Sequence, residues 1–221
     1  MYTNYLISAA VTLLIAILMY IYLGLRFRKG SSSALLLVFF LGIISIALNV
    51  FSVYLTNEAG FFPLGGNIKR VAFYALVTAG FVREFGKFLA IRIASFSRKD
   101  LNNPADGIVY SVMASLGFTL AALIWNIIFF QEDSQELYRS FLTLPANIIT
   151  AIILGFFLGL GEQRKNRFID SMTGLIAATL FHAVFEFSML TSDVSLILVV
   201  FTGSIVIVGI LISKAISLST S

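Results

Sequence analysis

Residues 34–55 read ALLLVFFLGIISIALNVFSVYL, an apolar stretch without a charged side chain. A helix rises about 1.5 Å per residue, so this stretch alone is long enough to cross a bilayer hydrocarbon core of roughly 30 Å. No proline interrupts it, and its one amide side chain is Asn49. The stretch is therefore predicted to be a transmembrane helix.

Similar apolar runs recur along the whole chain. Together they predict about seven spans, at residues 5–25, 34–55, 71–95, 107–130, 141–160, 172–190 and 194–213. Composition agrees, because 59% of the 221 residues are hydrophobic and 12% are charged, too few polar side chains to cover a soluble globule. The links between the runs are short. Residues 1–221 are therefore expected to form one integral membrane domain, an all-α polytopic transmembrane helical bundle.

Lysine and arginine are distributed unequally among the predicted links. The first, third and fifth links and the segment after the last span hold ten of them, whereas the second and fourth links hold three. The ten are Arg26, Arg28, Lys29, Arg92, Arg98, Lys99, Arg164, Lys165, Arg167 and Lys214, and the three are Lys69, Arg70 and Arg139. Because cytoplasmic links are enriched in positive charge, the N-terminus is predicted to lie outside and the C-terminus in the cytoplasm.

The net charge of +4 comes from these basic residues of the links. Basic residues in short links serve as topology signals and contact anionic lipid headgroups, and they do not indicate nucleic acid as a partner. The chain has no cysteine, which excludes disulfides, thiolate catalysis and thiolate metal sites.

Five ionisable residues lie well inside predicted spans, away from their ends: Arg83, Glu84 and Lys87 in residues 71–95, and His182 and Glu186 in residues 172–190. Such a side chain costs at least about 2 to 3 kcal/mol in hydrocarbon unless it is paired or reaches water. Glu84 precedes Lys87 by three residues and can neutralise it on the same helix. Glu84 and His182 both fall near the bilayer midplane, since their spans run in opposite directions. We therefore expect these two helices to face each other.

Asparagine supplies the other strongly polar groups inside the spans. Asn49, Asn126 and Asn147 are expected to border the same interior. The alternative for all these polar residues is a purely structural role, and for Asn49 and Asn126 an interhelical hydrogen bond is the favoured interpretation. Small residues four positions apart also predict close helix packing: Ala151, Gly155 and Gly159 in one span, and Ser111 and Ser115 in another.

Four sequence segments occur in a fixed order, and they contain the five ionisable residues and Asn147. They are GFVREFGKF at residues 80–88, DGIVY at 106–110 followed by LGF at 116–118, LPAN at 144–147 followed by Gly155 and Gly159, and LFHAVFE at 180–186. In order and spacing they resemble the E-E-x-x-K, D-G, P-x-H and H-x-x-x-N motifs of PrsW-type intramembrane proteases, which are related to the CAAX prenyl endopeptidase group. The resemblance covers residues 71–190, the expected PrsW-like core.

The resemblance implies a protease of the bacterial cytoplasmic membrane that acts on membrane-anchored protein substrates, such as anti-sigma factors. It places Glu84, Lys87 and His182 on the family's catalytic positions. It also implies a metal ion, zinc in the first instance, with a carboxylate as general base on a bound water. In this sequence the residues that could ligate such a metal are Glu84, His182 and Glu186.

Three positions depart from the family pattern. Arg83 stands in place of the first glutamate, Asn147 in place of a histidine, and Glu186 in place of an asparagine. Arginine cannot ligate a cation, and asparagine is a poorer zinc ligand than imidazole. The gain of a cation at Arg83 and of an anion at Glu186 predicts an ion pair between the two helices in place of the metal or water.

Three functions follow from these features. The favoured one is a PrsW-like pseudoprotease with impaired or lost catalysis that binds membrane-anchored clients or lipids. The second is an active metal-dependent intramembrane protease that uses Glu84, His182 and Glu186. The third is a small transporter with the buried charges as a relay, which is less favoured because the sequence shows no internal repeat.

Overall fold

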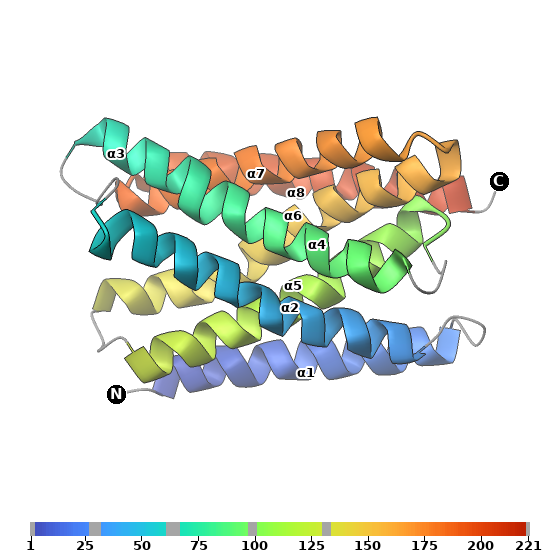
Figure 1. Cartoon of the computed structure of the whole chain (residues 1–221), viewed down its shortest axis with the longest axis horizontal. Coiled ribbons are helices and arrows are strands. Elements are labelled where there is room, and N and C mark those ends of the chain that lie inside the picture. The colour runs from blue at the N-terminus through green and yellow to red at the C-terminus, as the bar shows by residue number, and fades with distance from the viewer. Residues whose placement is uncertain (1–2, 27–31, 61–66, 97–100, 130–133, 220–221) are drawn as a thin grey trace.

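The computed structural model of the chain describes residues 3–26, 32–60, 67–96, 101–129 and 134–219, and all the regular secondary structure in them is helical. The helices lie lengthwise in one bundle, with the two ends of the chain at opposite ends of it (Figure 1). In chain order they are α1 (Thr3–Arg26), α2 (Ser32–Val53), η1 (Tyr54–Glu58), α3 (Ile68–Phe73), η2 (Tyr74–Phe81), α4 (Val82–Phe96), α5 (Pro104–Phe129), α6 (Ser134–Arg164), α7 (Arg167–Leu190) and α8 (Val194–Ser219). The prediction of an all-α protein is confirmed.

Two of these elements, η1 and η2, are π-helical segments inside longer helices. α2 continues into η1, and α3, η2 and α4 form one continuous helix. The described residues therefore build seven helical rods. Five stretches are long and apolar enough to cross a membrane: Ser33–Glu58, Pro104–Phe129, Leu142–Arg164, Arg167–Leu190 and Val194–Ser219.

The full count of seven spans stays a prediction, as does the orientation. In α1 the described apolar stretch is the shorter Ala9–Leu18. The rod of α3, η2 and α4 carries Arg83, Glu84 and Lys87 along its length. Four of the basic residues that predict the orientation, Arg28, Lys29, Arg98 and Lys99, lie outside the described residues.

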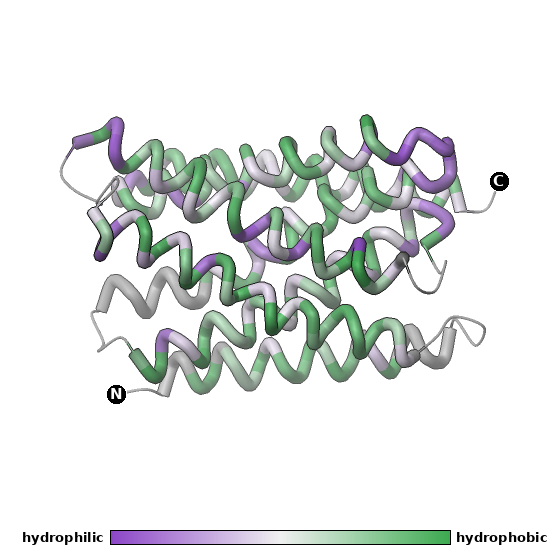
Figure 2. The backbone as a smooth tube through the Cα atoms, viewed as in Figure 1, coloured by the Kyte–Doolittle hydropathy of each residue, from purple (hydrophilic) through white to green (hydrophobic). Residues whose placement is uncertain are grey.

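Large apolar side chains cover the outside of the bundle. Phe40 and Ile44 of α2 are 57% and 64% exposed, and Leu198 of α8 is 62% exposed. Green, hydrophobic segments run along most of each helix in Figure 2, while purple segments gather at the ends of the bundle and at one place in its middle. This surface suits a hydrocarbon surrounding and leaves the central polar segment as the exception.

Glycines set the closest contact between α5 and α6. A Cβ atom on Gly107 would collide with the backbone of Gly155, and one on Gly159 would collide with the carbonyl of Asn103. The predicted close packing at Gly155 and Gly159 is thus confirmed, and it occurs inside the bundle. On the same two helices the Ser115 hydroxyl donates to the backbone carbonyl of Asn147 at 2.8 Å. The contact brings α6 and its Asn147 into the interior.

A second close contact joins η2 to α7. A Cβ on Gly80 would lie 3.0 Å from the Thr179 carbonyl oxygen and 3.1 Å from the Cβ of Ala183. η2 has the wide turns of a π-helix, which shift the register of the side chains that follow it. Glu84 comes one turn after Gly80 and His182 almost one turn after Thr179. The contact at Gly80 therefore places these two ionisable side chains opposite each other.

Candidate functional site

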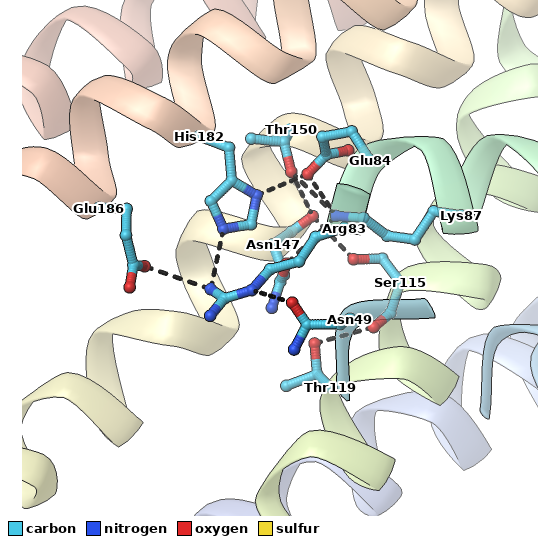
Figure 3. A network of polar contacts seen from close by, with 10 residues as sticks. All are labelled: Asn49, Arg83, Glu84, Lys87, Ser115, Thr119, Asn147, Thr150, His182 and Glu186. Carbon is cyan, nitrogen blue, oxygen red and sulfur yellow. Dashed lines mark hydrogen bonds and ion pairs between the residues drawn. The ribbon is translucent and has the colours of Figure 1, made fainter. Parts of the chain in front are cut away.

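A network of polar side chains occupies the middle of the bundle (Figure 3). We call it the polar centre, and it comprises Arg83, Glu84 and Lys87 of α4, His182 and Glu186 of α7, Asn147 and Thr150 of α6, and Asn49 of α2. The five ionisable residues singled out in the sequence thus come together, with two of the three asparagines. Asn126 is not one of the residues in this network.

Glu84 links the two helices at the heart of the polar centre. Its Oε1 atom lies 2.6 Å from Lys87 Nζ and 2.6 Å from His182 Nδ1. Glu84 and Lys87 are fully buried, and His182 is 1% exposed. Both the predicted pairing of Glu84 with Lys87 and the predicted approach of Glu84 to His182 are confirmed. In a low-dielectric interior, each of these contacts is stronger than at a surface.

Lys87 uses all three of its ammonium donors. Besides Glu84, it donates to Asn147 Oδ1 at 3.1 Å and to Thr150 Oγ1 at 3.3 Å. An ammonium group only donates hydrogen bonds, so the amide oxygen of Asn147 has to face Lys87. The Nδ2 atom of Asn147 is buried without a hydrogen-bond partner.

Thr150 is a member of the polar centre that the sequence interpretation missed. It lies three residues after Asn147 on α6, and its hydroxyl donates to the Asn147 carbonyl at 3.2 Å while it accepts from Lys87. The spacing of three residues on one helix was a usable signal, because such residues share a face. Threonine is common in membrane helices, however, and its hydroxyl usually bonds to its own helix. The helix pattern alone therefore did not single it out.

Arg83 lies between α7 and α2. Its NH1 atom is 3.2 Å from Glu186 Oε2 and 3.5 Å from His182 Nε2, and its Nε donates to Asn49 Oδ1 at 3.2 Å. The predicted ion pair of Arg83 and Glu186 is confirmed, and so is the interhelical hydrogen bond expected of Asn49. The Arg83 and Glu186 side chains are 18% and 17% exposed, unlike the fully buried Glu84 and Lys87.

The donor set of the polar centre does not fit a metal ion. Both ring nitrogens of His182 already face other side chains, Nδ1 toward Glu84 and Nε2 toward Arg83. Glu186 pairs with Arg83, so this third candidate ligand is also already engaged by a cation. Within the described residues, no three His, Asp or Glu side chains are close enough together to hold a metal. Zinc sites in proteins use three or four ligands at about 2 Å, and the neighbouring cations would repel the ion.

A separate ionic cluster lies toward one end of the bundle. Arg92 of α4 and Arg167 of α7 both pair with Glu162 of α6, at 2.8 and 2.6 Å. Arg92 also donates to the hydroxyl of Ser171. Two of the basic residues that predict the orientation therefore also join three helices.

The comparisons with known proteins agree with the family resemblance seen in the sequence. The model of the family described as PrsW family intramembrane metalloprotease matches residues 30–213, a longer stretch than the resemblance at residues 71–190. The chain is 27% identical over 192 residues to Protease PrsW of Geobacillus kaustophilus (strain HTA426), covering 85% of this chain and 81% of that protein. It is 30% identical over 165 residues to Protease PrsW of Clostridioides difficile (strain 630), covering 70% and 67%. For Protease PrsW of Bacillus subtilis (strain 168) the identity is 27% over 186 residues, covering 82% and 81%. No solved structure matches the chain.

Proposed function

This chain belongs to the PrsW family of intramembrane metalloproteases, and we propose that it binds membrane-anchored protein clients through the family framework while its own peptidase chemistry is impaired or lost. Its apolar spans make it an integral membrane protein, and its curated relatives are bacterial. Substrates of a protease family are proteins, so membrane-anchored proteins are the clients that we propose for this chain.

One observation supports the proposal above the others. The Arg83 guanidinium lies 3.2 Å from Glu186 and 3.5 Å from His182 Nε2, between two of the groups that the family resemblance suggests as metal ligands. A guanidinium stays protonated at any physiological pH and offers only donors. The arginine therefore occupies, as a fixed internal cation, the place that a metal would need.

The ion pair between Lys87 and Glu84 also supports the proposal. The Lys87 ammonium pairs with Glu84 at 2.6 Å, so the carboxylate expected to activate water is already engaged by a cation and by His182. A general base must accept a proton from the attacking water, and the Oε1 atom of Glu84 already contacts two other groups, Lys87 and His182. Hydrolysis by Glu84 would thus be slow even if water reached it.

The test combines metal analysis with a cleavage assay on the full chain in detergent and in liposomes. We expect less than stoichiometric zinc and no cleavage of a tethered single-span reporter. The variant Arg83→Glu with Asn147→His and Glu186→Asn, which restores the family motif residues, is expected to gain zinc. Lys69→Glu, an exposed charge reversal at a helix end, is the matched control and should bind no more zinc than the unmodified chain.

The second candidate is an active metal-dependent protease that uses Glu84, His182 and Glu186. The Glu84 Oε2 atom, which is buried without a hydrogen-bond partner, favours it. Zinc bound at about one ion per chain, and lost in both Glu84→Gln and His182→Ala, would establish this function and overturn the first.

A further inference from the structure

The ionic cluster that joins α4, α6 and α7 carries more positive than negative charge. Arg92 and Arg167 share the single carboxylate of Glu162, at 2.8 and 2.6 Å, with one oxygen atom for each arginine. One positive charge of the cluster therefore remains uncompensated. Arg164 and Lys165, at the turn between α6 and α7, are exposed and add two further positive charges at the same end of the bundle.

The nearby carboxylate of Asp170 is buried and does not reach the exposed side of the cluster. Asp170 is 9% exposed, and a Cβ atom on Gly161 of α6 would lie 3.2 Å from its own Cβ. Asp170 lies in the first turn of α7, where the aligned peptide dipoles favour a negative charge. The exposed side of the cluster is thus formed by cations.

The two arginines of the cluster are held very differently. Arg92 donates to Glu162, to the hydroxyl of Ser171 and to the backbone carbonyl of Arg167, and its side chain is 25% exposed. The Arg167 side chain is 71% exposed and pairs with Glu162 through Nε. Within the described residues this guanidinium has no other side-chain partner, so its Nη1 and Nη2 groups remain available. Two such groups side by side match the geometry of a phosphate.

The turn between α6 and α7 holds Arg167 in a defined place. The Asn166 amide donates to the Gly161 carbonyl at 3.0 Å, and Lys165 adopts a positive φ of 58°. A Cβ atom on Gly161 would lie 3.3 Å from the Arg167 Cα atom. The chain therefore reverses direction tightly, and the guanidinium starts from a backbone position that is fixed against α6.

An exposed apolar face of α7 begins directly after Arg167. Phe168 and Ile169 are 76% and 60% exposed, and Ile176 and Leu180, farther along the helix, are 60% and 51% exposed. Ile169, Ile176 and Leu180 share one face, because residues three, four or seven apart lie above one another in a helix. A phosphate-binding group thus lies at one end of an apolar stripe, which is the arrangement of a phospholipid.

We propose that Arg167 binds the phosphate of an anionic phospholipid, whose acyl chain lies along Ile169, Ile176 and Leu180 of α7. Arg164 and Lys165 add only to the surrounding positive potential. The expectation that basic residues of the links contact lipid headgroups thereby becomes one defined site. It goes beyond the proposed client binding and does not depend on it. A phosphate on Arg167 leaves Glu162 to Arg92, so the lipid lies at the junction that fixes α4 relative to α7.

Tryptophan quenching by brominated lipids tests the site on the full chain. Phe168→Trp in a Trp125→Phe background places the one tryptophan of the chain next to Arg167. Vesicles mix brominated phosphatidylglycerol with phosphatidylcholine, and the reverse labelling gives the relative affinity of the two lipids. We expect an about fivefold preference for phosphatidylglycerol, the size of effect that one cation at a membrane surface produces.

Three substitutions separate a phosphate site from diffuse charge. Arg167→Gln is expected to lower the preference to less than about twofold. Arg167→Lys keeps the charge but loses the planar pair of donors, and it should lose at least half of the preference. Arg164→Gln removes an exposed arginine three residues away and is the matched control, which should retain most of the preference.

A second reporter lies at the other end of the rod formed by α3, η2 and α4 (Figure 1). Ile68 is 65% exposed and precedes Lys69 and Arg70, so Ile68→Trp in the same background also lies beside two cations. Its lipid preference should not respond to Arg167→Gln.

Four results would each overturn the lipid site. They are no preference at position 168, equal losses in Arg164→Gln and Arg167→Gln, full retention in Arg167→Lys, and a loss of the preference on addition of inorganic phosphate. The first three would show that the cations act through diffuse charge or not at all. The fourth would identify a soluble phosphate as the ligand.

Discussion

Arg83 on α4 and Glu186 on α7 form an ion pair of 3.2 Å across the interior of the bundle. The same guanidinium group is 3.5 Å from His182 Nε2. One residue supplies a cation and the other an anion, so either charge without the other would be unpaired inside the bundle.

Breaking this ion pair should destabilise the protein. Arg83→Met and Glu186→Leu are each expected to lower the free energy of unfolding by about 1 to 3 kcal/mol, less than for a fully buried pair because both side chains retain some exposure. The double variant should recover part of the loss, since it leaves no unpaired charge. Steric-trapping measurements in bilayers would give these values, with Arg70→Met at an exposed helix position as control. Additive losses in the double variant would contradict the pairing.

Removal of the buried ammonium should be more damaging. Lys87→Met leaves the fully buried Glu84 without its cation, which we expect to cost about 3 to 5 kcal/mol of stability. Combining it with Glu84→Gln removes both charges and should restore at least half of that loss. Unfolding of the two variants in the same membrane mimetic is the measurement. A Lys87→Met variant as stable as the unmodified chain would show that this ion pair is not needed.

A side chain at Gly80 should separate η2 from α7. A Cβ there lies 2.9 Å from the Ala75 carbonyl oxygen and 3.0 Å from that of Thr179. Gly80→Val is expected to lower the unfolding free energy by about 2 to 3 kcal/mol, as overpacking does. Gly203→Ala, where nothing lies within 4 Å, is the control and should be neutral or slightly stabilising because alanine favours the helix. Equal stability of the two variants would contradict the close contact.

The Thr150 hydroxyl should matter through its bond with Lys87. Thr150→Val keeps the shape and removes the acceptor, and we expect a loss of about 1 to 2 kcal/mol in stability. Thr150→Ser should retain most of it. Thr202→Val on the exposed face of α8 tests whether any threonine replacement has the same effect. If Thr150→Ser is as unstable as Thr150→Val, the hydroxyl is not the responsible group.

Metal removal should leave the protein unchanged. Because the polar centre satisfies its charges internally, treatment with a strong chelator is expected to shift the melting temperature by less than about 1 °C, whereas loss of a tightly bound metal would lower it by several degrees. The matched control is the motif-restored variant loaded with zinc, which should lose stability on chelation. A clear drop for the unmodified chain would indicate a metal site.

Much of the polar centre was predictable because helix geometry is local. Glu84 and Lys87 are three residues apart, so their pairing follows from the helical period whatever surrounds them. The facing of Glu84 and His182 followed from the depth of each residue in its span. The ion pair of Arg83 with Glu186 was predicted from the family resemblance, because the two residues appear as a complementary cation and anion at its motif positions. Thr150 was not predicted, because its contact with Lys87 depends on how α6 is rotated against α4.

The sequence by itself determined that this protein is helical, that its spans are apolar, and that a few charges inside them need partners. Those conclusions do not depend on neighbouring helices. They follow from the bilayer, in which each segment must form its backbone hydrogen bonds within itself. Only the tertiary structure decided that Arg83 also contacts His182, beside its predicted partner Glu186, and that Asn147 turns its oxygen toward Lys87. These outcomes depend on close approaches such as that of Gly80 to α7 and of Gly155 to α5, where a single Cβ would change which side chains meet.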